Sequence, residues 1–177
     1  MRQFSLPVSL LALIALSAAL SWPSFAQEAV NPFASVKQDM NQEIRIAADR
    51  TTADFENETA TYSGNVVVRQ GQMVMRSDAI VIFAPEGKIT RIEAQGNVVL
   101  TSPNGSAESE KAIYEVVPRL VTLTGGVVLT ERNNVMRGSK LEVRLATGEA
   151  KLIGALGPDG KPGRVQGLFA PAEGQGN

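Results

Sequence analysis

Few side chains in this 177-residue sequence could carry out chemistry. It contains no histidine and no cysteine, which excludes Ser-His-Asp and Cys-His nucleophilic sites and the usual zinc sites. The remaining candidates are carboxylates, namely Asp49, Asp54, Asp78, Glu93, Glu108 and Glu110. No two of them share an apolar setting that would separate their pKa values, as acid–base catalysis requires. We therefore predict solvated surface charges, no enzyme activity, no cofactor and no metal site.

The segments that carry these carboxylates belong to an internal repeat. Three Gly-centred copies are Tyr62–Val68, Ala94–Leu100 and Leu123–Leu129. Their first glycines, Gly64, Gly96 and Gly125, lie 32 and then 29 residues apart, and a weaker copy ends at Gly154. Such self-similarity predicts one supersecondary unit stacked several times. A stack of this kind offers a long continuous surface rather than a single catalytic cleft.

Strand signals fill the chain from Glu43 to about Phe169. Val, Ile and Thr are abundant there, and Gly, Asn, Asp or Pro interrupts the runs about every ten residues, as in all-β domains. We predict an all-β fold of stacked antiparallel strands. Each repeat glycine falls in mid-strand, where it allows a bend, a bulge or a close approach of another chain.

Alternation within the strands gives every copy one apolar face, because side chains alternate across a strand. The predicted inward positions of the first halves are Ala60, Tyr62, Val66 and Val68, then Ile92, Ala94, Val98 and Leu100, then Val121, Leu123, Val127 and Leu129. In the second halves the pattern aligns Ala79, Val81 and Phe83 with Ala112, Tyr114 and Val116, and with Leu141, Val143 and Leu145. This alignment leaves Ile80 and Ile82 on the outward face.

The apolar face has two interpretations. One is an ordinary closed core, and the other is a trough whose two sides do not fully close and that holds a lipid or another long apolar ligand. Met73 and Met75 suit both, since methionine fills gaps in cores and forms tolerant binding surfaces. The first and last strands lack a covering helix, so we expect assembly through strand addition at both ends.

The amino terminus predicts export. Arg2 precedes an apolar stretch of 13 residues, Val8–Leu20, and Ser24 and Ala26 fit a cleavage site after Ala26. The alternative is a retained anchor, but the stretch is shorter than the ~18–20 residues that cross a bilayer. We predict a cleavable signal peptide over 1–26, a flexible leader over 27–42, the β domain over 43–170 and a disordered tail over 171–177. Without Arg2 the chain has 16 basic and 18 acidic residues, and no basic run indicates a nucleic-acid partner.

Several short motifs, in this order and spacing, resemble the LptA/OstA family of periplasmic lipopolysaccharide transport proteins. They are Ile44–Asp49, Tyr62–Gly71, Met75–Ala79, Val121–Leu129 and Met136–Leu141. The resemblance implies an open β-jelly roll with a hydrophobic groove, located in the periplasm. It implies a non-enzymatic bridge that shields the acyl chains of lipopolysaccharide between the inner and outer membranes. It also implies an LptC-like partner at the N-terminal edge, an LptD-like partner at the C-terminal edge and a possible end-to-end homo-oligomer.

Carried over onto this sequence, the resemblance assigns the apolar inward positions to a lipid-binding groove, with Ile44 and Ile46 near its entrance. The predicted groove residues are Ile44, Ile46, Tyr62, Val66, Val68, Met73, Met75, Val81, Phe83, Ile92, Val98, Leu100, Tyr114, Val121, Leu123, Val127, Leu129, Leu141 and Val143. Two other functions stay open from the residues alone. One is a structural or adhesive exported β-repeat protein with a closed core. The other is a carboxylate-based glycan hydrolase, although aromatic platforms for sugar stacking are scarce.

Overall fold

The computed structural model describes residues 32–33, 41–155 and 163–170. The predicted signal peptide and tail, and most of the predicted leader, lie outside the described residues. The described residues form ten strands: β1 (Arg45–Ala47), β2 (Arg50–Asp54), β3 (Thr59–Gln70), β4 (Met73–Phe83), β5 (Arg91–Ser102), β6 (Gly105–Glu115), β7 (Leu120–Glu131), β8 (Asn134–Arg144), β9 (Glu149–Ile153) and β10 (Gln166–Leu168). The short 3-10 helix η2 (Pro85–Gly87) joins β4 to β5. Within these ranges no helix is long and apolar enough to cross a membrane.

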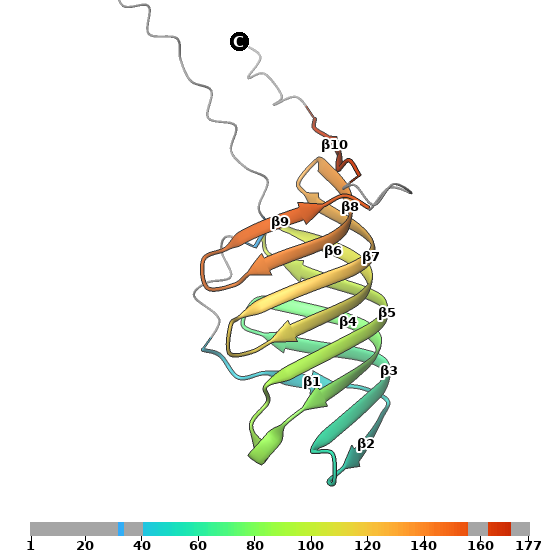
Figure 1. The fold of residues 1–177 in the computed structure, drawn as a ribbon, viewed down its shortest axis with the longest axis vertical. Helices are drawn as coiled ribbons and strands as arrows, with labels where there is room; N and C mark the ends of the chain where they lie inside the picture. Colours follow the sequence, from blue (N-terminus) through green and yellow to red (C-terminus); the bar gives the residue numbers. More distant parts are fainter. Residues whose placement is uncertain (1–31, 34–40, 156–162, 171–177) are drawn as a thin grey trace, which may run out of the picture.

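The strands form one antiparallel sheet, in agreement with the all-β prediction. Its order is β1-β3-β4-β5-β6-β7-β8-β10, with β2 paired to β3 and β9 paired to β8. Each long strand curves back on itself, so the two halves of the sheet face each other across an apolar interior (Figure 1). The result is an open jelly roll whose edges are β1 with β2 at one end and β9 with β10 at the other.

The repeat glycines lie at the bends. Gly64, Gly96 and Gly125 have φ values of 79°, 75° and 85°, which side chains with a Cβ rarely adopt. The sheet register shifts at each of these positions. A Cβ on Gly64 or Gly96 would also collide with the carboxylate of Asp49 or Asp78 on the adjacent segment. The predicted bend and bulge at the repeat glycines are therefore confirmed.

An asparagine follows the glycine at two of the bends. Asn65 and Asn97 both have a φ of 47°, a left-handed conformation that asparagine tolerates better than most residues. Asn65 Nδ2 donates a hydrogen bond to Asp49 Oδ2 at 2.8 Å, and Asn97 Nδ2 donates one to Asp78 Oδ2 at 2.9 Å. Two successive repeats thus fix the bend with the same acid–asparagine pair.

The prediction that Val81 and Phe83 point inward is wrong. Ile80 and Ile82 are 0% and 4% exposed and face the interior, while Val81 and Phe83 lie on the outward face, where the guanidinium of the exposed Arg91 stacks on the Phe83 ring. The cause is the register shift at the bend of β4. An irregularity of one residue reverses the alternation beyond it, and the prediction carried the alternation straight through.

Part of the predicted leader is packed against the domain. Pro32 is buried and Phe33 is 0% exposed within the core cluster. The Ser102 hydroxyl donates a hydrogen bond to the Pro32 carbonyl oxygen. The expectation of a flexible leader therefore fails for these two residues, because an apolar side chain placed beside an open apolar interior gains free energy by burial.

Candidate functional site

The candidate site is the apolar interior between the two halves of the sheet, called the trough below. Most predicted groove residues are buried in it: Val66, Val68, Met73, Met75, Ile92, Val98, Leu100, Tyr114, Val121, Leu123, Val127, Leu129, Leu141 and Val143. Ile44, Ile46 and Tyr62 are half-buried and pack against its edge. Val81 and Phe83 lie outside it, as described above.

The trough is continuous from one edge of the sheet to the other. In one half, directly paired residues run from β3 to β9 in the order Tyr62, Ile80, Ala94, Ala112, Leu123, Leu141 and Leu152. In the other half they run from β1 to β8 in the order Ile46, Val68, Met75, Leu100, Ala107, Leu129 and Met136. Cross-strand neighbours on one face contact each other. Each half therefore presents an unbroken apolar ladder, and no charged group interrupts either one.

Sequence reasoning missed several trough residues. Ile80, Ile82, Ala107 and Phe33 are all buried in the core cluster but were not among the predicted groove positions. The spacing of the repeat glycines indicates that Ile80 and Ile82 point inward, because the 32-residue step between Gly64 and Gly96 aligns Ile80 with Ala112 and Ile82 with Tyr114. For Phe33 no such signal exists, since it precedes the repeats.

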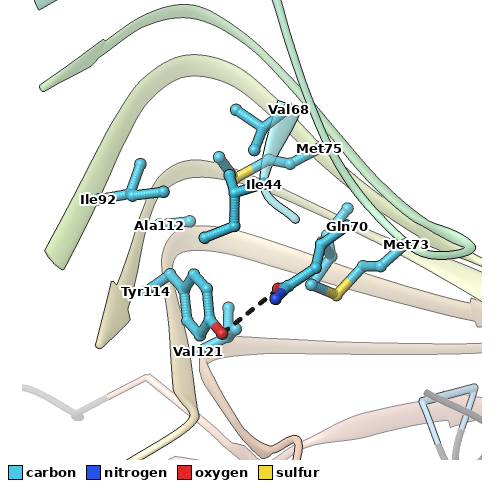
Figure 2. A pocket seen from close by; sticks show the side chains of 10 residues that line it. Ile44, Val68, Gln70, Met73, Met75, Ile92, Ala112, Tyr114 and Val121 are labelled. Carbon is cyan, nitrogen blue, oxygen red and sulfur yellow. Dashed lines mark hydrogen bonds between the residues drawn. The ribbon is translucent and has the colours of Figure 1, made fainter. Parts of the chain in front are cut away.

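A small cavity lies toward the N-terminal end of the trough (Figure 2). Its lining residues are Ile44, Val68, Gln70, Met73, Met75, Ile92, Leu100, Ala112, Tyr114 and Val121. The cavity volume is about 30 Å³, which has room for about two water molecules and not for a long acyl chain. This part of the trough is therefore nearly filled by its own side chains, and a long apolar ligand enters here only if part of the lining moves aside.

Two polar side chains, Tyr114 and Gln70, lie within this lining. The Tyr114 hydroxyl donates a hydrogen bond to Gln70 Oε1 at 3.4 Å (Figure 2), and Gln70 Nε2 donates one to the Gln42 carbonyl oxygen at 3.1 Å. Burial raises the pKa of Tyr114 above its ordinary 10.0, with the charge of Arg119 and the hydrogen bond to Gln70 acting in the opposite direction. Tyr114 is therefore neutral at physiological pH and offers hydrogen bonding without charge.

The carboxylates considered for catalysis lie away from the trough. Asp49, Asp54, Asp78, Glu108 and Glu110 are exposed, and Glu93 is half-buried on the outward face. The described residues hold no group of three or more His, Cys, Asp or Glu side chains that could bind a metal ion. Asp54 accepts hydrogen bonds from Asn57 and from the Glu56 amide, which lower its pKa and keep it ionised. These charges belong to turns, bends and the solvated face.

An antiparallel sheet folded over an apolar interior defines the class of open β-jelly rolls, and comparison with known proteins specifies the family. Residues 45–149 match the family model described as LptA/(LptD N-terminal domain) LPS transport protein. The chain belongs to this family of lipopolysaccharide transport proteins. Membership of a transport family supports the prediction that the chain is not an enzyme.

Three relatives illustrate the family. Lipopolysaccharide export system protein LptA of Haemophilus influenzae is 29% identical over 148 residues, covering 78% of this chain and 83% of the relative. LptA of Escherichia coli K12 is 27% identical over 118 residues, covering 62% of this chain and 64% of the relative. An uncharacterized protein of Rhizobium meliloti is 30% identical over 153 residues, covering 81% of this chain and 79% of the relative.

A solved structure confirms the fold. LptH of Pseudomonas aeruginosa, described as the LptA-homologous periplasmic component of the conserved lipopolysaccharide transport device, superposes with a TM-score of 0.64 at 21% identity. The match covers 75% of this chain and 99% of that one. The open jelly roll expected from the sequence is therefore the observed fold.

Proposed function

We propose that this chain is a periplasmic bridge that binds lipopolysaccharide in its trough and shields the acyl chains on their way from the inner to the outer membrane. The observation that carries the proposal is the pair of unbroken apolar ladders, which run across the sheet in a chain that belongs to a lipopolysaccharide transport family. The groove residues are the inward residues of these ladders, with Ile80 and Ile82 in place of Val81 and Phe83.

The physical case rests on the acyl chains. Each methylene moved out of water is worth about 0.8 kcal/mol, so a lipid with several chains needs a continuous apolar surface to cross an aqueous compartment. A lining of Val, Leu, Ile, Ala and Met supplies that surface without directional bonds. An acyl chain can then shift from one trough residue to its paired neighbour on the next strand, with nearly the same apolar area buried at each position.

The two edges suit exchange with partners. Every residue of β2 and of β10 is exposed, and Leu168 and Phe169 are 70% and 52% exposed at the C-terminal edge. Unpaired strand edges accept strands from other chains. We assign an LptC-like inner-membrane partner to the β1–β2 edge and an LptD-like outer-membrane partner to the β9–β10 edge. End-to-end contact between copies of this chain uses the same two edges.

A second candidate is a structural or adhesive β-repeat protein with a closed core. The small volume of the cavity at the N-terminal end of the trough, about 30 Å³, favours it. The two candidates differ in whether inward side chains meet lipid.

Photocrosslinking at adjacent positions separates them. A small diazirine-bearing aliphatic amino acid replaces Val98, which is 1% exposed and inward, or its outward neighbour Val99. The proposal predicts that lipopolysaccharide crosslinks at position 98 and not at position 99. Absence of crosslinks at both positions, in protein shown to be folded by circular dichroism, would favour the closed-core candidate.

A further inference from the structure

The bends of the long strands close one side of the trough. The turns that join the strand ends lie on the opposite side and form two rows, which we call the first and the second rim. The first rim consists of the β3–β4, β5–β6 and β7–β8 turns, and the second rim of the β4–β5, β6–β7 and β8–β9 turns. Because the strands fold back at their bends (Figure 1), the two rims come close to each other, and Tyr114 at the end of β6 donates its hydrogen bond to Gln70 at the end of β3. We call the side of the trough between the rims its mouth.

Residues just before β1 join the two rims. Asn41 Oδ1 accepts a hydrogen bond from Arg119 Nη2 at 3.2 Å, and Arg119 lies in the β6–β7 turn of the second rim. The next residue, Gln42, accepts through its carbonyl oxygen a 3.1 Å hydrogen bond from Gln70 at the end of β3, on the first rim. Two consecutive residues are thus bonded to opposite rims. We call Asn41–Ile44 the strap.

The strap also places a side chain inside. Ile44 lines the small cavity together with Tyr114 and Met75 (Figure 2). Asn41, Gln42 and Glu43 are exposed, so the strap covers the mouth with its polar side chains outward and its isoleucine inward.

A second piece of the same region fills the trough further along. Phe33 is 0% exposed among the core residues. Pro32 holds it at the first rim through its hydrogen bond from Ser102, and the Pro32 ring lies against Gly105, where a Cβ would collide with it. We call Pro32–Phe33 the plug. Neither the plug nor the strap belongs to a strand of the sheet.

The strap and the plug lie outside the strand pairing that holds most of the described lining. Each long strand is held by paired rows on both sides, for instance ten paired residues between β5 and β6. The described contacts of the strap and plug include hydrogen bonds to both rims and the burial of Ile44 and Phe33, but no row of strand pairing. Segments with few tertiary bonds open at lower free energy than paired strands.

We propose that the seat of Phe33 and the cavity beneath Ile44 are acyl-chain subsites that the chain itself occupies, so that lipopolysaccharide binds by displacing the plug and the strap. The inference rests on the proposed function. It adds that the plug and the strap of the same chain compete with lipopolysaccharide for the trough. A saturated acyl chain replaces an aromatic and a branched side chain in the same apolar surroundings. The polar strap covers the mouth when the trough carries no lipid.

A tryptophan reporter tests the displacement. The chain has one tryptophan, Trp22, so the double variant Trp22→Phe with Phe33→Trp reports only from the plug. Its emission is expected at short wavelength and weakly quenched by acrylamide, and addition of lipopolysaccharide is expected to shift it to longer wavelength with saturable, stronger quenching. The matched control is Trp22→Phe with Phe55→Trp at a position that is 91% exposed, where quenching stays high throughout.

Crosslinking at Val98 in the same reporter protein distinguishes a failure of the displaced plug from a failure of the proposed function. Crosslinking to lipopolysaccharide with an unchanged, buried tryptophan signal would overturn the displaced plug and leave the proposed function standing. Absence of both crosslinking and emission change would overturn both.

A surface variant tests the competition without altering the trough. Asn41→Ala removes the bond to Arg119, and we expect lipopolysaccharide to bind about fivefold more tightly, the factor for one net hydrogen bond. Asn133→Ala, in the exposed β7–β8 turn, is the matched control with unchanged affinity. Unchanged or weaker binding by Asn41→Ala would contradict the competition.

Discussion

The inner and outer faces of the sheet come from alternating residues of the same strands, yet they differ in what their side chains meet. Leu123 is 0% exposed, and its paired neighbours Ala112 and Leu141 are buried and apolar. One residue further on, Thr124 faces outward between Lys111 and Lys140. The inner face thus forms one apolar surface, whereas charged side chains interrupt the outer face, as Arg76 does between Val67 and Val99. A ligand that slides can use only the first.

Some charges of the outer face form local pairs. Arg91 Nε lies 3.1 Å from Glu93 Oε1, and Lys140 Nζ lies 2.7 Å from Glu142 Oε1. The hydrogen bond and charge of Lys140 lower the pKa of Glu142, so Glu142 stays ionised over the physiological range. Exposed pairs of this kind contribute little to stability. Their main effect is to keep the outer face solvated beside an apolar interior.

The largest expected effect separates the two faces directly. Leu123→Asp places a charge in the apolar ladder and is expected to lower the free energy of unfolding by more than about 4 kcal/mol. Thr124→Asp, on the neighbouring outward position beside two lysines, is expected to change it by less than about 1 kcal/mol. Urea unfolding followed by circular dichroism measures both. Similar losses for the two variants would show that the faces are not distinct.

The bends provide a smaller effect with its own matched control. Gly96→Ala combines a positive φ with a collision against Asp78, and we expect a loss of about 3 kcal/mol. Gly87 has the same φ of 75° but nothing within 4 Å of an added Cβ, so Gly87→Ala is expected to lose only about 1 kcal/mol. Equal losses in thermal or urea unfolding would mean that the close approach of Asp78 does not fix the bend.

The smallest effect concerns the one hydroxyl in the cavity lining. Because burial raises the pKa of Tyr114 in the folded state above 10.0, the neutral form is favoured by folding. The stabilisation is complete below pH 10 and is lost as the pH rises through the folded-state pKa. The wild-type protein should therefore lose more stability than Tyr114→Phe between pH 9 and pH 11, a window chosen about the ordinary pKa of tyrosine, about 10. Parallel unfolding curves of the two proteins across that range would contradict the burial of this hydroxyl.

Local sequence pattern was enough to predict the repeat, the all-β fold and most of the trough. In β3, β5 and β7 every second residue points inward on both sides of the bend, so the pattern predicts the correct face for Val66, Val98 and Leu129. In β4 the alternation shifts by one residue at the bend, so the pattern predicts the wrong face for Val81 and Phe83. Two-residue periodicity carries no information about a bulge. The 32-residue spacing of the glycines does, because it aligns whole units rather than single strands.

The plug and the strap could not be predicted in this way. Phe33 lies outside the repeats, and its burial depends on the distant Ser102 and Gly105. Asn41 and Gln42 make their contacts with Arg119 and Gln70 across the folded mouth. Such contacts follow from the tertiary arrangement, which brings the two rims together. Local sequence pattern therefore predicts the strands that form the trough, but not the plug and the strap that cover it.

The central claim is that the inner face carries lipid along its whole length, and a crosslinking scan along the ladder tests it most directly. The diazirine amino acid is placed at Val68 in β3 and at Leu129 in β7, each compared with its outward neighbour, Val67 or Val128. The account predicts crosslinks to lipopolysaccharide at both inward positions and at neither outward one. Crosslinks at neither inward position, or equal crosslinks on both faces of folded protein, would contradict it.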